Sequence, residues 1–300
     1  MVTREANPVP SFRDQSLVWH GHHLTLRRLD EMEVASPGNK WFKLRHNLER
    51  ALMQPSKSLL TFGGPHSNHL LATARACSEI QIRCIGLVRG GEVETPVMRA
   101  CRNAGMTLIP ISRSLYKEKT DPDFLNSLRV EWNNPWVVPE GGANEFGVHG
   151  AQDILQTSDS HFDCIVLSVG TGTTLAGMAL KCDGEIPFIG VSALKGVHHE
   201  SEVIKLLHRT TGDLNWSKHL LRKVTWWTDA HTGGFGKMNP ELRCFMTSFV
   251  QDTQIPLDRI YTAKTFLRLQ KELEKPTPER HPFIQENRRI LVVHTGGISP

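Results

Sequence analysis

Short apolar segments alternate with helix-length amphipathic segments along most of the chain, and this alternation constrains the fold more than any other feature. From residue 58 onward, apolar runs such as 84–88 and 164–169 are each followed by a stretch with helical spacing of its apolar residues. Runs that are apolar at nearly every position are typical of strands buried on both faces. The pattern therefore predicts an α/β fold, with parallel sheets covered by helices on both sides.

The predicted strands are 58–62, 84–88, 106–111, 136–138, 164–169, 188–191, 224–228 and 290–294. The predicted helices are 67–78, 96–103, 123–132, 174–181, 201–209, 240–252 and 262–273. At 300 residues, the chain is long enough for one large domain or two modest ones.

Composition narrows the class of protein. Hydrophobic residues make up 39% and charged residues 22%, as in ordinary globular proteins. A net charge of +4, with no long run of Lys or Arg, does not indicate the basic surface that nucleic-acid binding requires. No apolar run approaches the ~20 residues of a membrane helix, and the N-terminus lacks the apolar stretch of a signal peptide. We therefore expect a cytoplasmic protein with no nucleic-acid or membrane partner.

Four loops at predicted strand ends are rich in Gly, Ser, Thr and Asn, namely 63–68, 140–144, 170–174 and 294–297. In parallel sheets, ligands bind where the carboxyl ends of strands meet helix N-termini. The loop Gly-Thr-Gly-Thr-Thr at 170–174 opens a helix, so its backbone N–H groups and hydroxyls suit a phosphate. It is neither a Walker A loop nor a dinucleotide fingerprint, which disfavours a nucleotide-binding protein. A plain helix-capping turn is the alternative.

Two further segments carry candidate chemistry. Lys40 follows Gly-Asn in a predicted loop and precedes the apolar residues Trp41 and Phe42, which places it at the edge of an apolar site. Desolvation lowers the pKa of an amine and frees it to form a Schiff base, although a lysine in a loop is often a solvated charge. Ser67 and Asn68 open a predicted helix and suit a carboxylate or a phenolic oxygen, unless Ser67 is only an N-cap.

Together, these segments resemble the fold-type II pyridoxal phosphate enzymes, and within them the 1-aminocyclopropane-1-carboxylate deaminase/D-cysteine desulfhydrase family. The resemblance extends from about residue 28 to residue 297. Its motifs occur in the family's order, at 38–44, 62–69, 140–147, 170–177, 256–264 and 293–297.

The resemblance implies the roles of individual residues. Lys40 would carry the cofactor pyridoxal 5′-phosphate, Ser67 and Tyr261 would be catalytic, and Asn68 would contact the phenolic oxygen of the cofactor. The remaining residues expected to bind the cofactor are Gly170, Thr171, Gly172, Thr173, Thr174, Thr262 and Thr295. No histidine is expected to be catalytic and no metal site is expected. The loop 231–236 resembles one that lies over the substrate in the family, although it also suits a flexible turn.

The implied fold has two doubly wound, three-layer α/β/α domains of the tryptophan synthase β-subunit-like type, with the cofactor in the cleft between them. Residues 46–149 would form a small inserted domain, and residues 1–45 and 150–300 the large one. A homodimer is a further expectation from the fold.

The implied activity is that of a lyase or deaminase acting on a small amino acid. Thr262 and Thr295 resemble the polar pair of the D-cysteine desulfhydrases, whereas the cyclopropane deaminases are expected to carry Glu and Leu at these positions. A neutral hydroxyl at the pyridine nitrogen suits β-elimination. The alternatives are 1-aminocyclopropane-1-carboxylate deaminase, another amino-acid lyase or racemase, and a non-catalytic pyridoxal phosphate-binding protein. Phe42 departs from the family's Arg, which predicts the loss of a positive charge beside Lys40.

Overall fold

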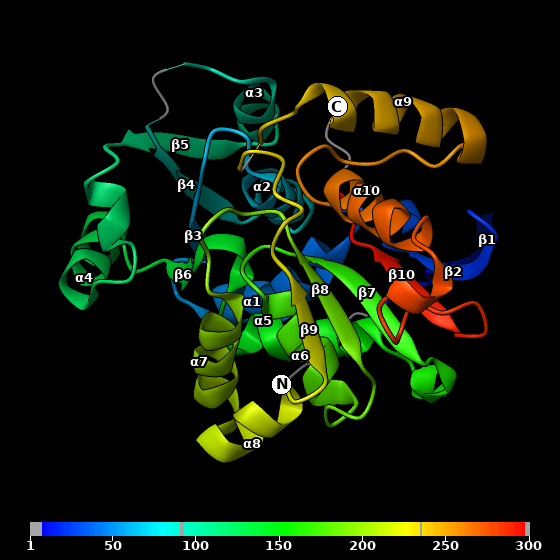
Figure 1. The fold of residues 1–300 in the computed structure, drawn as a ribbon. Coiled ribbons are helices and arrows are strands. Elements are labelled where there is room, and N and C mark those ends of the chain that lie inside the picture. Colours follow the sequence, from blue (N-terminus) through cyan, green and yellow to red (C-terminus); the bar gives the residue numbers. More distant parts are fainter. Residues whose placement is uncertain (1–7, 91–92, 235, 298–300) are drawn as a thin grey trace.

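The computed structural model describes residues 8–90, 93–234 and 236–297, and it contains two sheets (Figure 1). The larger sheet has the strand order β1-β2-β10-β7-β8-β9, and the smaller sheet has the order β5-β4-β3-β6. All neighbouring strands are parallel except β1 and β2, which pair antiparallel. The N-terminal segment, where no signal peptide is expected, lies largely outside the described residues.

The strands of the larger sheet are β1 (Arg13–Trp19), β2 (His22–Arg28), β7 (Cys164–Val169), β8 (Phe188–Ser192), β9 (Val224–Trp227) and β10 (Ile290–His294). Those of the smaller sheet are β3 (Ser58–Gly63), β4 (Arg83–Arg89), β5 (Met106–Ile111) and β6 (Trp136–Val138). The helices are α1 (Asn39–Met53), α2 (Asn68–Glu79), α3 (Pro96–Asn103), α4 (Pro122–Glu131), α5 (Glu145–Ala151), α6 (Thr173–Lys181), α7 (His199–Thr211), α8 (Leu214–Leu220), α9 (Pro240–Thr253) and α10 (Thr262–Leu273). Within the described ranges, none of these helices is both long and apolar enough to cross a membrane.

Each sheet is covered on both faces. In β7, Ile165 and Leu167 join the apolar cluster that includes residues of α5 and α6, whereas Val166 joins the cluster on the side of α9 and α10. In β3, Leu59 and Leu60 likewise face different clusters. Alternate side chains of a strand point to opposite faces, so both sheets are the middle layer of a sandwich. The prediction of two three-layer α/β domains is confirmed.

The first 57 residues contain structure that the sequence pattern did not predict. Strands β1 and β2 form a hairpin at the edge of the larger sheet, and β2 then pairs with β10 from the other end of the chain. The prediction of a loop at Lys40 is wrong, because Lys40 is the second residue of helix α1. Gly38 precedes this helix with a φ of +105°, a conformation that separates the Ser-Pro-Gly turn from the helix.

Glycines let α1 and α6 pack against the backbone of α5. A Cβ atom on Gly150 would lie 1.9 Å from the carbonyl oxygen of Phe42 in α1. One on Gly177 in α6 would lie 2.5 Å from the Cβ atom of Ala151 and from the carbonyl oxygen of Val148. Such contacts exclude any side chain, so the three helices form a unit that fixes the start of α1 relative to the start of α6.

We predict that Gly150→Ala destabilises the protein by about 3 kcal/mol, because the new methyl group must displace the backbone of α1. Alanine is the better helix former, so helix propensity alone would predict a gain in stability. Urea unfolding of the variant measures the change.

Gly212→Ala is the control, because Gly212 has a φ of +74° but open space around its Cβ position. It should lose only about 1 kcal/mol. Equal stability of the Gly150→Ala variant and the unmodified protein would contradict the close packing of α1 on α5.

Candidate active site

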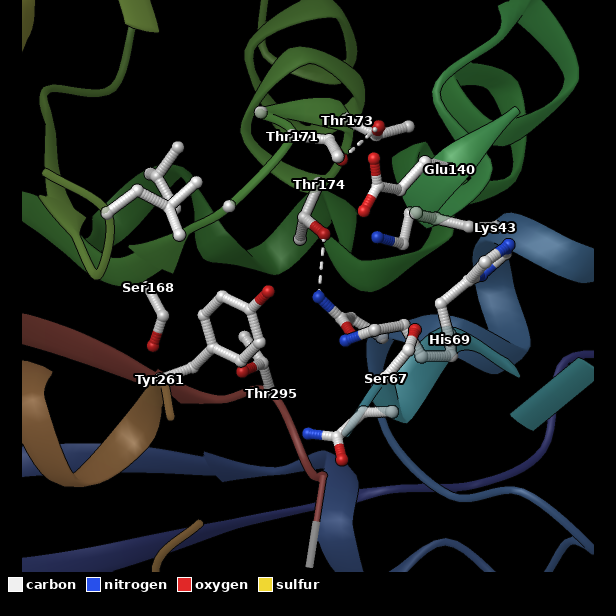
Figure 2. Close-up of a pocket in the computed structure, with 18 of the residues that line it drawn as sticks. Lys43, Ser67, His69, Glu140, Ser168, Thr171, Thr173, Thr174, Tyr261 and Thr295 are labelled. Atoms are coloured by element: carbon white, nitrogen blue, oxygen red, sulfur yellow. Dashed lines mark hydrogen bonds between the residues drawn. The ribbon is translucent and has the colours of Figure 1, made fainter. Parts of the chain in front are cut away.

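A cavity of about 260 Å³ lies where the carboxyl ends of strands from both sheets meet the N-termini of α1, α2 and α6 (Figure 2). The structure brings together every predicted site residue except Thr262. Those that line the cavity are Lys40, Ser67, Asn68, Gly170, Thr171, Gly172, Thr173, Thr174, Tyr261 and Thr295.

The loop from Gly170 to Thr174 joins β7 to α6 and forms one end of the cavity. Gly172 is the N-cap of α6 with a φ of +79°, and a Cβ atom on it would lie 2.2 Å from Val203. The hydroxyls of Thr171 and Thr173 are 3.0 Å apart (Figure 2). The first turn of a helix leaves backbone N–H groups unpaired and carries positive potential, so this end of the cavity suits an anion.

Two lysines from one face of α1 line the same cavity. Burial lowers the pKa of Lys40 to about 8, although the negative charge of Asp258 opposes this shift. Burial and the charge of Lys40 also lower the pKa of Lys43 well below its ordinary value. Among the described residues, neither lysine has an ion pair. The cavity therefore combines an amine that is partly neutral near pH 8 with a second buried amine whose charged form an anionic ligand would stabilise.

Asn39 connects Lys40 to the Gly/Thr loop. The Lys40 Nζ donates a hydrogen bond to Asn39 Oδ1 at 2.7 Å, and Asn39 Nδ2 donates to Thr174 Oγ1 at 2.8 Å. The backbone N–H of Asn39 donates to the carbonyl oxygen of Thr295 at 3.0 Å. A Cβ atom on Gly38 would lie 2.5 Å from that same carbonyl oxygen. The start of α1 is thus held against both the Gly/Thr loop and the end of β10.

The N-terminus of α2 forms another wall. Ser67 is the N-cap of this helix, and its Oγ accepts a hydrogen bond from the N–H of Leu70 at 3.2 Å. This bond does not use the hydroxyl proton, so capping and ligand contact are compatible. The helix terminus also favours negative charge, which suits the carboxylate of an amino acid.

His69 lines the cavity in a defined tautomer. Thr61 donates its hydroxyl proton to the carbonyl oxygen of Val138, so His69 Nε2, at 2.9 Å, must donate to Thr61 Oγ1. Burial and the neighbouring lysines lower the pKa of His69 well below its ordinary value, which keeps the ring neutral. Among the described residues, its Nδ1 has no hydrogen-bond partner.

Tyr261 lies across the cavity from Ser67 (Figure 2). The Lys40 Nζ is 5.5 Å from the centre of its ring. A Cβ atom on Gly170 would lie 3.0 Å from the ring, so the phenol rests on the Gly/Thr loop. Burial and the charge of Asp258 raise the pKa of Tyr261, so the phenol keeps its proton at neutral pH.

Thr262 does not join this group. Its Oγ1 accepts a hydrogen bond from the N–H of Asp258 at 2.8 Å and lies 3.0 Å from Asp258 Oδ2. The buried hydroxyl is therefore used to stabilise the turn before α10, and Thr262 is absent from the cavity wall.

Several cavity residues were not predicted as site residues, including Asn39, Lys43, His69, Arg89, Glu140 and Ser168. Lys43 lies three residues after Lys40, a spacing that indicates a shared helix face once the segment is known to be a helix. Phe42 is fully buried in the core, beside Phe12, and is absent from the cavity wall. Within the described residues, no cluster of His, Cys, Asp or Glu suits a metal ion.

Comparison with known proteins finds relatives that cover nearly the whole chain, although no protein-family model matches it. A D-cysteine desulfhydrase of Klebsiella pneumoniae is 26% identical, over 92% of this chain and 87% of that protein. The crystal structure of an ACC deaminase homologue has a TM-score of 0.80 at 26% identity, and the match covers 98% of this chain and 91% of that one.

A pyridoxal 5′-phosphate-dependent aspartate racemase shares the fold, with a TM-score of 0.62 at 14% identity over 96% of this chain and 91% of that one. The resemblance carried by the motifs is thus confirmed by sequence and by fold. Over nearly its whole length, the chain is therefore similar in sequence and fold to proteins of the 1-aminocyclopropane-1-carboxylate deaminase/D-cysteine desulfhydrase family of fold-type II pyridoxal phosphate enzymes.

Proposed function

We propose that this protein is a pyridoxal 5′-phosphate-dependent lyase that binds the cofactor on Lys40 and converts D-cysteine to pyruvate, ammonia and sulfide. One observation carries the proposal: a lysine with its pKa lowered to about 8 shares a cavity with the N-terminus of α6, which is suited to an anion. The named relatives that span the chain include D-cysteine desulfhydrases.

The residues present fit this cofactor. Lys40 supplies the amine that reacts with its aldehyde carbon. The Gly170–Thr174 loop and Lys43 would hold the phosphate, since the loop supplies hydrogen-bond donors and a bound phosphate would favour the charged form of the buried Lys43 amine. Thr295 would offer a neutral hydroxyl to the pyridine nitrogen, and Asn68 an amide to the phenolic oxygen.

The bound cofactor supplies an electron sink for the electron pair left on the Cα atom when its proton is removed. Lys40 is the base for that proton, and an amine with a pKa of about 8 accepts and returns it near neutral pH. Ser67 and the N-terminus of α2 orient the substrate carboxylate. Tyr261 keeps its proton and donates it to the departing sulfur when the Cβ–S bond breaks. Water then completes the conversion to pyruvate and ammonia.

The preference for a desulfhydrase over a cyclopropane deaminase rests on Thr295, because Thr262 faces away from the cavity. A cofactor ring whose nitrogen faces a neutral hydroxyl would withdraw less electron density from the Cα atom than a ring whose protonated nitrogen is paired with a carboxylate. Elimination of a good leaving group such as sulfide requires less withdrawal than opening a carbon ring.

We also propose the domain bounds 46–149 for the small domain, and 1–45 with 150–300 for the large one. The two sheets support this division, although the first boundary falls within α1. We further propose that the protein is a cytoplasmic homodimer and that its substrate is a small amino acid.

We expect the purified protein to show a visible absorption band with added pyridoxal phosphate, and borohydride to remove this band. Peptide mass spectrometry should then find the reduced cofactor on Lys40. Lys40→Ala should abolish this attachment. Lys43→Ala should keep it while weakening cofactor affinity by about tenfold or more, because a buried charge-assisted contact to the phosphate is lost. Attachment at another lysine would contradict the assignment.

The lowered pKa of Lys40 predicts a pH dependence for cofactor attachment, because only the free amine reacts. The initial rate should rise by about tenfold per pH unit below pH 8 and level off above it, as the protonated form disappears. Stopped-flow absorbance with the cofactor-free protein measures this profile. A rate that still rises steeply beyond pH 9 would show an ordinary lysine.

D-cysteine, L-cysteine, D-serine and 1-aminocyclopropane-1-carboxylate should be assayed together. We expect pyruvate and sulfide from D-cysteine at the highest kcat/KM. Tyr261→Phe should lower kcat by about 10²-fold or more through the loss of its proton, with cofactor attachment retained. Highest turnover of the cyclopropane acid would transfer the assignment to the deaminase. Attachment of the cofactor without product from any of the four would contradict the desulfhydrase assignment and favour a non-catalytic binding protein.

A further inference from the structure

Lys264 is a buried lysine outside the cavity wall. It lies on α10, one turn after Tyr261, and is 1% exposed. Its Nζ donates to the carbonyl oxygens of Gly234 at 2.7 Å, His231 at 2.9 Å and Ala193 at 3.3 Å. Burial lowers its pKa to about 8, and only the charge of Asp258 opposes this effect. Among the described residues, no carboxylate forms an ion pair with Lys264.

The three carbonyl groups come from two separate segments. Ala193 directly follows β8 and precedes Leu194, which lines the candidate active site. His231 and Gly234 belong to the loop between β9 and α9 (Figure 1). Further along this loop, Met238 lines a second cavity together with His66 and Pro96 from the small-domain side. Lys264 therefore ties α10 to a wall of the active site and to a loop that approaches the other domain.

Thr232, Gly233 and Gly234 have φ values of +47°, +96° and +129°, so no helix or strand holds this part of the loop. Its backbone forms turn contacts within the loop, from Gly234 N–H to the carbonyl oxygen of His231 and from Lys237 N–H to that of Gly234, and Lys264 adds a contact to another element. The converging carbonyl dipoles of the three acceptors repel one another unless a positive charge lies between them. Clustered backbone carbonyls are the kind of ligand that hard cations bind in proteins. An ammonium group provides the same charge with three directed donors.

We propose that Lys264 is a built-in replacement for a bound monovalent cation, and that it positions the loop after β9 and the Leu194 wall relative to Tyr261. Its effect on catalysis rests on the proposed function, but the tie itself does not. Lys264 is a positioning residue, since it touches neither the cavity nor the reacting atoms.

Lys264→Ala tests the proposal because it removes the ammonium and leaves space between the carbonyl oxygens. Tryptic cleavage after the exposed Lys237, at the end of the loop, reports whether the loop is held. In tetramethylammonium chloride, which is too large to enter, we expect cleavage about tenfold faster than in the unmodified protein. Potassium or ammonium chloride at the same ionic strength should restore slow cleavage and raise the Tm.

Two controls separate charge from packing. Lys264→Met fills the space without a charge, so potassium and ammonium should not rescue it. Lys271→Ala removes an exposed lysine from the same helix and should behave as the unmodified protein in every salt. If Lys264→Ala fails to fold in tetramethylammonium, then folding should return in ammonium chloride. Cleavage at the unmodified rate, or a defect that is the same in all salts, would overturn the proposal.

Activity gives a separate readout. Lys264→Ala should still attach the cofactor at Lys40, while kcat/KM for D-cysteine falls and then recovers with ammonium. Proteolysis and Tm measurements need no substrate. If the protein acts on none of the four amino acids, the proposed function is refuted, but the role of Lys264 can still be tested by these two measurements.

Discussion

The close approach of α1, α5 and α6 is the constraint on which the rest of the site depends. Gly150 and Gly177 allow backbone-to-backbone contact at places where even a methyl group would collide. As a result, the N-terminus of α1, which carries Lys40, has a fixed place beside the N-terminus of α6. The hydrogen bonds from Lys40 through Asn39 to Thr174 are possible only because the helices are this close.

This arrangement concentrates positive potential in a small buried volume. Two lysines and the N-termini of α1, α2 and α6 face one cavity; burial lowers the pKa of both lysines, and the charge of Lys40 lowers that of Lys43 further. An anionic ligand relieves the repulsion at Lys43, whereas burial keeps part of the Lys40 amine neutral near pH 8. The neutral tautomer of His69 and the protonated phenol of Tyr261 follow from the same buried surroundings.

Helix α10 connects the cavity to its surroundings. Tyr261 at its start lines the cavity, whereas Lys264 one turn later binds backbone carbonyl groups outside the cavity wall. Thr265 adds a contact to Ser168 at 2.9 Å, so the helix is also fixed to the end of β7. A single helix therefore sets the position of the phenol relative to both the larger sheet and the loop after β9.

The sequence by itself determined the α/β class, every described strand after residue 57 and the loops at the carboxyl ends of these strands. These features depend on local patterns of apolar residues and on turn chemistry, which are visible within a few positions. The place of Lys40 in a helix was missed because α1 begins after Gly38, whose positive φ accompanies close contacts with Thr295 and Gly296 from the other end of the chain. The tertiary structure alone decided that Lys43 shares the cavity, that Thr262 does not and that Phe42 packs into the core. Those outcomes depend on which helix face meets which neighbour, and that is set by contacts between residues far apart in the chain.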